Sequence, residues 1–172
     1  MTVGLSVIRF RIQHSTYAQN QSITSTKGET VMIEISKSIF ISRAAEDIFA
    51  YVTDPNHTHE WQEDTISAST DGELSVGVTG SYTQRLMGRE VESATECIAY
   101  DPPYRIGWQT IGGPIKFLAT YDLEPQDGGT LVVQNIEAEA GGFFKVAEGV
   151  VAKQAAGGAE RDLNNLKAIM ES

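Results

Sequence analysis

Apolar and polar residues alternate along the segment MIEISKSIFI, residues 32–41. Ile33, Ile35, Ile39 and Ile41 fall on one side of this pattern, and its phase slips near Lys37. A period of two is typical of a strand with one buried face. We therefore predict a first strand over this segment.

A helical period follows the first strand. In SRAAEDIFAYVTD, residues 42–54, apolar residues recur at helical spacing, and Ser42 stands where an N-cap is expected. Asp54 and the proline after it end this helix. PNHTHEWQ, residues 55–62, opens with that proline in a first-turn position and has room for about two more turns. Two short helices are therefore expected.

From residue 65 to residue 140 the period returns to two, and turn sequences such as MGRE, DPPY and PQDGG interrupt it. This pattern predicts an antiparallel meander. The expected strands are 64–69, 80–87, 91–100, 105–111, 115–123 and 131–140.

The last segment, residues 142–172, contains no proline and carries one apolar helical stripe, which predicts a long C-terminal helix. Its weak point is Gly157-Gly158, because glycine costs about 1 kcal/mol relative to alanine inside a helix. The glycine pair fits two roles equally well, close packing of the helix on the sheet or a hinge that lets the helix lift. The stripe consists of Phe144, Val151, Ala155, Ala159, Leu163, Leu166 and Met170.

The order of elements predicts an α+β fold. A curved antiparallel sheet of seven strands has one apolar face that must be covered, and the last helix is the element long enough to cover it. The two short helices after the first strand then close one open end.

The first 31 residues form a different kind of chain, rich in Ser, Thr, Gln and Asn and without a sustained apolar period after Phe10. We predict that residues 1–31 are a disordered N-terminal tail. The codons for KGE, residues 27–29, would form a purine-rich run resembling a bacterial ribosome-binding site just before Met32. We therefore also expect that translation can start at Met32, so that the tail is not made.

Five stretches, taken with the order of elements, resemble the polyketide cyclase/dehydrase and lipid-transport family of the START-like (SRPBCC) superfamily. They are IFAYVTDPNHTHEWQ, GSYTQRLMGREVES, YDPPYRIGWQT, TYDLEP and GGTLVV. The resemblance covers residues 32–172 and implies the helix-grip fold. It also implies a cavity between the sheet and the long helix that holds a hydrophobic or aromatic ligand. No catalytic signature of that family matches residue by residue.

The net charge of the chain limits the classes of partner that it can bind. The chain has 13 basic and 23 acidic residues, and the first 31 residues hold three of the basic ones and one of the acidic ones, which leaves a net charge of −12 on the rest. Such a domain repels phosphate backbones and anionic lipid surfaces, so nucleic acid and membrane are poor partners. No apolar run is long enough to span a bilayer. The single cysteine, Cys97, excludes an intramolecular disulfide and fits a cytoplasmic protein.

The stretch DPNHTHEWQED, residues 54–64, gathers two histidines and four carboxylates and raises the question of a metal site. His57 and His59 are two residues apart, which points them in opposite directions on a helix. A third ligand would also have to come from carboxylates without a supporting pattern. We therefore expect no metal there and interpret the stretch as a solvated helix that carries Trp61 inward.

The inner face of the sheet supplies the remaining candidates. Polar atoms on that face need partners, and a ligand or water should be among them. Thr95 and either Gln134 or Asn135 add to this polarity, and the small residues 155–159 opposite leave room. The predicted ligand-binding residues are Trp61, Tyr82, Gln84, Trp108, Phe117 and Tyr121.

Three functions stay open, and neither a cofactor nor an oligomeric state follows from the sequence. The first is a non-catalytic carrier or sensor of a hydrophobic small molecule. The second is a polyketide cyclase or dehydratase-like enzyme in the same cavity, with a tyrosine or buried carboxylate as acid or base. The third is a partner-binding module of the co-chaperone type. The absence of a recognisable acid/base set favours the first.

Overall fold

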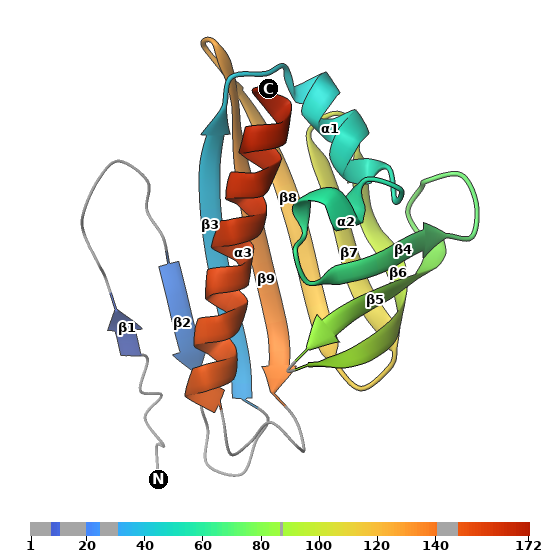
Figure 1. Ribbon diagram of the computed structural model, residues 1–172, viewed down its shortest axis with the longest axis vertical. Helices are drawn as coiled ribbons and strands as arrows, with labels where there is room; N and C mark the ends of the chain where they lie inside the picture. Colours follow the sequence, from blue (N-terminus) through green and yellow to red (C-terminus); the bar gives the residue numbers. More distant parts are fainter. Residues whose placement is uncertain (1–7, 11–19, 25–30, 87, 141–147) are drawn as a thin grey trace, which may run out of the picture.

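The computed structural model describes residues 8–10, 20–24, 31–86, 88–140 and 148–172. These residues form a nine-stranded sheet with the order β1-β2-β3-β9-β8-β7-β6-β5-β4. Every neighbouring pair is antiparallel. The helix α3 (Glu148–Met170) runs along one face of this sheet, as Figure 1 shows.

The seven predicted strands and their curved antiparallel arrangement are confirmed. They are β3 (Val31–Ile41), β4 (Thr65–Thr70), β5 (Thr79–Leu86), β6 (Arg89–Asp101), β7 (Arg105–Gly112), β8 (Lys116–Gln126) and β9 (Gly129–Ala140).

Two further strands differ from the prediction of a disordered segment 1–31. β1 (Ile8–Phe10) pairs with β2 (Asn20–Thr24), and β2 pairs with β3 from Met32 to Ser36. Backbone pairing onto the open edge of β3 needs no apolar period, which is why the pattern of side chains did not reveal these strands. Whether translation can start at Met32 stays a prediction.

The two short helices are α1 (Ala45–Thr53) and α2 (Thr58–Trp61). The predicted cap at Ser42 is wrong, because α1 begins at Ala45 and its N-cap position, Ala44, makes no side-chain hydrogen bond. The backbone N–H of Ser42 instead donates to Oε1 of Glu171 at 2.8 Å, near the end of α3. This contact ties the start of α1 to the end of the long helix.

Lys37 corrects the expected phase slip in β3. The inner face of β3 continues through this position, between the buried residue Ile35 and the partly buried residue Ile39. Lys37 itself is only 5% exposed, and its Nζ lies 3.1 Å from Oε2 of Glu160 on α3. The alternation is therefore unbroken, with a lysine at one inward position.

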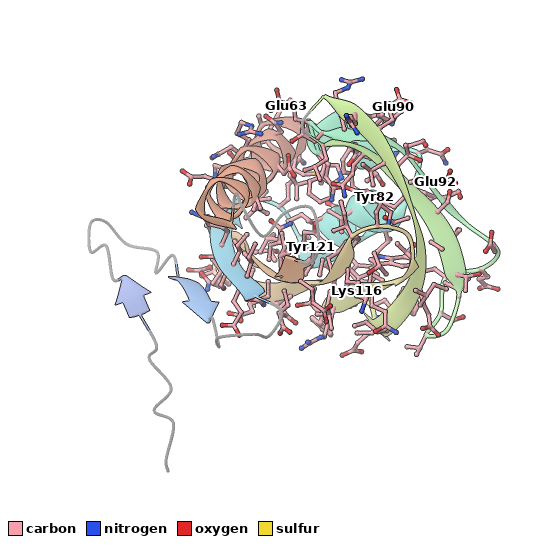
Figure 2. The ribbon with its side chains drawn as sticks, turned by 90° about the horizontal axis from the view of Figure 1, so that it is seen from below. Glu63, Tyr82, Glu90, Glu92, Lys116 and Tyr121 are labelled. Carbon is pink, nitrogen blue, oxygen red and sulfur yellow. The ribbon has the colours of Figure 1, made fainter. Side chains whose placement is uncertain are left out.

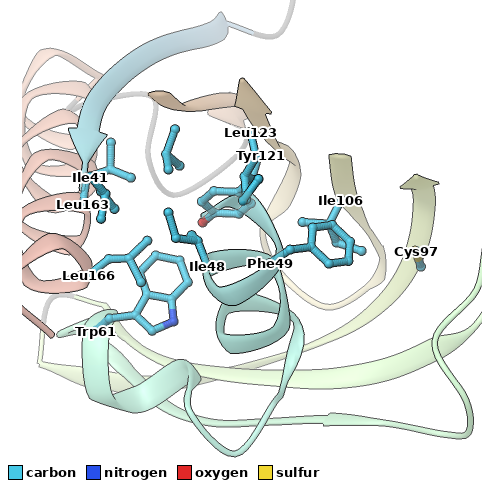
Figure 3. Packing of buried hydrophobic residues seen from close by; sticks show 12 residues of the cluster. Ile41, Ile48, Phe49, Trp61, Cys97, Ile106, Tyr121, Leu123, Leu163 and Leu166 are labelled. Atoms are coloured by element: carbon cyan, nitrogen blue, oxygen red, sulfur yellow. The ribbon is translucent and has the colours of Figure 1, made fainter. Parts of the chain in front are cut away.

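The main core lies between the sheet, α1 and the C-terminal half of α3 (Figure 3). It is built from aliphatic and aromatic side chains, and among the twelve buried residues are Ile41, Ile48, Phe49, Trp61, Leu123, Val132, Leu163 and Leu166. The predicted stripe of α3 is present from Ala155 onward, and Phe144 and the side chain of Val151 lie outside the described part of the structure. None of the described helices is long and apolar enough to cross a membrane.

Candidate functional site

The sheet, α2 and α3 surround a cavity of about 290 Å³. Figure 2 shows Tyr82 and Tyr121 inside the ring formed by the sheet and α3, whereas Glu90 and Glu92 lie on its outer side. On α3 the wall consists of Ala155, Gly158, Ala159 and Asp162. The volume is at the lower end of the range usual for small-molecule sites, so the cavity suits a compact ligand.

All six predicted site residues line this cavity. Trp61 comes from the end of α2, and the others come from three neighbouring strands, β5, β7 and β8. The ring of Tyr82 meets Phe117 edge to face at 6.0 Å, and the ring of Tyr121 meets Trp61 in the same manner at 5.6 Å. Their part in holding a ligand stays a prediction, because their position alone does not identify what they bind.

The choice that the sequence left open between Gln134 and Asn135 is resolved by the pleat of β9. Gln134 is buried and lines the cavity. Asn135 lies on the other face, where it accepts a hydrogen bond from Ser36 at 2.7 Å and donates to Asp122 at 3.5 Å. Thr95 also lines the cavity, as expected.

A row of inward polar residues crosses three neighbouring strands of the sheet. Lys37 of β3 pairs in register with Gln134 of β9, which pairs with Tyr121 of β8. On one side of this row, β9 and β8 contribute the core residues Val132 and Leu123. On the other side the same strands contribute residues of the cavity wall, among them Ile136, Ala138, Phe117 and Ala119. We call Lys37, Gln134 and Tyr121 the polar row.

The Tyr121 hydroxyl receives two hydrogen bonds. Nε2 of Gln62 donates to it at 3.0 Å and Nε2 of Gln134 donates at 2.8 Å. Two donors occupy both lone pairs of the oxygen, so the hydroxyl proton has to point elsewhere. Burial raises the pKa of Tyr121 well above its usual value, and the nearby Tyr82 and Asp162 raise it further. Tyr121 is therefore a neutral hydrogen-bond donor across the ordinary pH range.

Tyr82 differs because its hydroxyl proton has an acceptor inside the protein. It donates to Oε1 of Gln62 at 2.9 Å and lies 2.7 Å from Oγ1 of Thr65, which itself donates to Gln62 at 2.9 Å. Burial raises the pKa of Tyr82 to about 12. Gln62 thus connects the two tyrosines of the cavity, one hydroxyl at each end of its amide group.

Asp162 is, with Gln62, a site residue that was not predicted from the sequence. It lines the cavity from α3, and its Oδ1 accepts a hydrogen bond from the backbone N–H of Glu63 at 3.1 Å. Burial raises the pKa of the Asp162 carboxyl to about 6. The signal was present, since Asp162 follows Gly158 by four residues and Ala159 by three, which places it on their side of the helix.

Three contacts join α2 and the turn after it to α3. Arg161 Nε lies 2.7 Å from Oε2 of Glu63 and Arg161 Nη2 lies 3.6 Å from Oδ2 of Asp64. Nδ2 of Asn165 donates to the backbone oxygen of Trp61 at 3.3 Å. Together with the Asp162 hydrogen bond, they hold Trp61 and Gln62 in place at the cavity wall.

The ring of His57, at the N-cap of α2, contacts two neighbouring side chains. Nδ1 of His57 lies 3.2 Å from Oε1 of Glu60, and its ring stacks on Tyr51 at 4.4 Å. Within the described part of the chain, no group of His, Cys, Asp and Glu side chains is arranged to hold a metal ion. Burial raises the pKa of the Cys97 thiol, which makes this residue a poor nucleophile.

Comparison with known families gives one match, to the family model described as "Polyketide cyclase / dehydrase and lipid transport", over residues 32–171. No curated protein matches the chain.

Several solved structures share the fold. A protein of Thermus thermophilus superimposes with a TM-score of 0.70 at 18% identity, over 78% of this chain and 94% of that one. A START superfamily protein of Mycobacterium smegmatis gives 0.69 at 16% identity, over 80% and 97% of the two chains. The Zhui aromatase/cyclase of Streptomyces sp. R1128 gives 0.68 at 12% identity, over 81% and 94%. At these identities the likeness concerns the fold alone.

Proposed function

The chain belongs to the polyketide cyclase/dehydrase and lipid transport family, and from this premise we propose that it binds a hydrophobic or aromatic small molecule in the cavity between the sheet and α3, as a carrier or sensor. The family supports ligand binding or a cyclase role in general. The more specific role as a carrier or sensor is our inference, and it rests on the make-up of the cavity.

The observation that carries the proposal is a cavity wall of aromatic rings that also contains buried, unsatisfied polar atoms. Nε1 of Trp61 and Oε1 of Gln134 are both buried, and neither has a hydrogen-bond partner among the described residues. An unpaired buried polar atom costs about 1–3 kcal/mol. A sealed core would not retain two of them beside an empty volume, whereas a binding site gains specificity from them.

Native mass spectrometry of the protein purified from its own host tests the proposal, followed by denaturing extraction of anything it carries. The expected result is one apolar compound per chain, identified by its mass after extraction. A panel of apolar and aromatic compounds should also raise the melting temperature. If the protein is empty and no compound raises its melting temperature, the proposal is wrong and the partner-binding alternative gains support.

A second candidate function is favoured by Asp162. Ring closure of a poly-β-ketone requires a base that removes a proton from the carbon between two carbonyls, and the resulting enolate then attacks a third carbonyl. A carboxyl with a pKa near 6 exchanges protons at neutral pH. The neutral Tyr121 hydroxyl can donate a hydrogen bond to the carbonyl oxygen that becomes negative. Asp162 then returns its proton to that oxygen and gives a hydroxyl, and loss of this hydroxyl as water would complete a dehydration.

Incubation with a poly-β-ketone thioester, followed by mass analysis of the products, distinguishes the two functions. An enzyme gives a product lighter by one water, and Asp162→Asn abolishes that product while the protein still binds the substrate. A carrier returns the substrate unchanged apart from the uncatalysed background. A product formed equally fast with Asp162→Asn would remove Asp162 from the mechanism.

A further inference from the structure

Three neighbouring buried residues line the cavity where it borders the main core. They are Trp61, Tyr121 and Gln134, whose indole N–H, hydroxyl and amide groups we call the anchor. Their residues are 1%, 7% and 3% exposed, and all three line the cavity. Gln134 and Tyr121 are hydrogen-bonded at 2.8 Å, and the rings of Trp61 and Tyr121 are 5.6 Å apart. In Figure 3, Tyr121 and Trp61 lie together among the buried side chains.

The anchor has hydrogen-bonding capacity that the described residues do not use. The Tyr121 oxygen accepts from two amides, so its proton is left to donate. Oε1 of Gln134 is an unused acceptor and Nε1 of Trp61 is an unused donor. Turning the Gln134 amide over would pair the Tyr121 proton with Oε1, but Nε2 would then lose its acceptor. In either orientation one end of this buried amide has no hydrogen-bond partner among the described residues.

The unused atoms require a partner that both accepts and donates. A hydroxyl group meets this requirement, because its oxygen accepts from Tyr121 or Trp61 and its proton goes to Gln134. A water molecule has the same capacity, so a ligand hydroxyl replaces a water without losing hydrogen bonds. A methyl group in the same place would leave the Tyr121 proton, Oε1 of Gln134 and Nε1 of Trp61 without a partner.

The charges around the anchor disfavour an anion. Asp162 lines the same cavity and acts on the Tyr121 hydroxyl strongly enough to raise its pKa. Lys37 lies beside Gln134 in the polar row, but it does not line the cavity and its ammonium is paired with Glu160. Arg85, a cation in the described part of the lining, is an exposed residue of β5. A carboxylate at the anchor would therefore have the carboxyl of Asp162 in the same cavity, whereas the cation of the described lining, Arg85, is exposed to solvent.

From these observations we propose that the cavity selects a neutral ligand carrying a hydroxyl group, a phenol, enol or alcohol, which the anchor holds at the inner end. The proposal rests on the proposed function, since it presupposes that the cavity binds a small molecule, and adds the polar group by which the ligand is oriented. An ionised fatty acid is then a poor ligand even though its chain is apolar.

Three probes of nearly the same shape test this. At pH 7, 2-naphthol presents a neutral hydroxyl, 2-methylnaphthalene a methyl group and 2-naphthoate a carboxylate. Dissociation constants are measured by isothermal titration calorimetry. The wild-type protein should bind 2-naphthol at least tenfold more tightly than 2-methylnaphthalene, because two hydrogen bonds are gained. 2-Naphthoate should be the weakest of the three.

Substitutions in the anchor should remove the preference without removing binding. In Tyr121→Phe the ratio of the two constants should fall severalfold, because the ligand oxygen loses one of its two donors, while 2-methylnaphthalene keeps its affinity. Gln134→Met, which keeps the volume and removes the amide, should reduce the ratio as well and carries the test if Tyr121→Phe does not fold. Tyr100→Phe removes a hydroxyl outside the cavity lining and should leave the ratio unchanged.

The outcomes separate the two proposals. If 2-naphthol and 2-methylnaphthalene bind the wild type equally well, or if the ratio survives in the folded anchor variants, the hydroxyl preference is wrong and the proposed function stands. Tight binding of 2-naphthoate likewise overturns the preference for a neutral group. If none of the three probes binds, both the proposed function and this inference fail.

Discussion

The interface between α3 and the sheet has two halves, a closely packed one that belongs to the main core and a hollow one that contains the cavity. Beside α1, the helix presents Leu163 and Leu166, which pack into the main core. About one to three turns earlier it presents Ala155, Gly158 and Ala159, which line the cavity. The strands pass through both halves without changing direction. Side-chain volume on a single helix therefore decides where the fold is sealed and where it is hollow.

The polar row marks the boundary between these halves. Lys37, Gln134 and Tyr121 would each be costly in the middle of the core, because a buried polar group needs a partner. At the edge of a cavity, two of them can serve a ligand, and the third is paired with α3 through Glu160. On β8 and β9, the change from core to cavity wall thus takes place at a single inward-facing residue.

The largest effect on stability is expected when a side chain of the closely packed half is truncated. Leu166 is 0% exposed, and Leu166→Ala should lower the free energy of unfolding by about 3 kcal/mol, since a new void is created. Ile136→Ala in the cavity wall should cost about half as much, because that side chain already faces open space on one side. Urea unfolding of both variants measures the difference. Equal losses would mean that the two halves are packed alike.

Filling the cavity should weaken ligand binding. Gly158 lines the cavity and Gly157 does not, and a Cβ on either meets only the Arg161 side chain, at 3.9 and 3.6 Å. Gly158→Leu should therefore weaken binding of 2-methylnaphthalene at least tenfold, which is about 1.4 kcal/mol. Gly157→Leu has the same helix propensity and is the matched control. A similar loss in both variants would indicate a disturbed helix and not a filled cavity.

The carboxylate in the hollow half should make stability depend on pH. The pKa of Asp162 is raised to about 6 in the folded protein from its usual value of 3.8, so between these values the folded state binds more protons than the unfolded state. The wild type therefore loses stability as the pH rises through this window. Asp162→Asn, which can still accept from Glu63, should be more stable than the wild type by about 1–2 kcal/mol at pH 7.5. At pH 3.5 the gain should vanish, and a gain of equal size at both pH values would contradict the assigned burial.

The smallest effect concerns the glycine pair itself. Gly157→Ala should raise the free energy of unfolding by about 0.5–1 kcal/mol, because alanine is the better helix former and its Cβ has room. Urea midpoints of Gly157→Ala and the wild type measure the gain. A loss of stability would show that this turn of α3 needs the conformational freedom of glycine, as a hinge would.

The strands and helices could be predicted because their side chains repeat with a clear period and their turns carry Gly, Pro and Asp. β1 and β2 could not, since they are held by backbone pairing to the edge of β3. The start of α1 was misplaced at Ser42 because a good capping residue was present, but its N–H is used by Glu171. Lys37 looked like a change of phase because its partner, Glu160, lies 123 residues away in the sequence.

The candidate site was predicted as far as alternation allows. Once the parity of β5, β7 and β8 is known, Tyr82, Trp108 and Phe117 follow as inward residues, and all of them line the cavity. Gln62 did not follow, because its role depends on contacts between α2 and the strands that no local pattern encodes. Asp162 was not predicted, although its spacing from Gly158 and Ala159 places it on their side of α3. The ligand-binding role of these residues and a cytoplasmic location stay predictions.

The pair between Lys37 and Glu160 has a consequence for folding fidelity. A buried ammonium is tolerated only beside a carboxylate, so the pair penalises wrong alignments more than it stabilises the right one. If β3 slipped by one residue, Lys37 and its isoleucine neighbours would all turn outward. If α3 moved by one turn, about 5.4 Å, Glu160 would no longer reach. We therefore expect this ion pair to fix the position of α3 along the sheet. It thereby also fixes the size of the cavity between them.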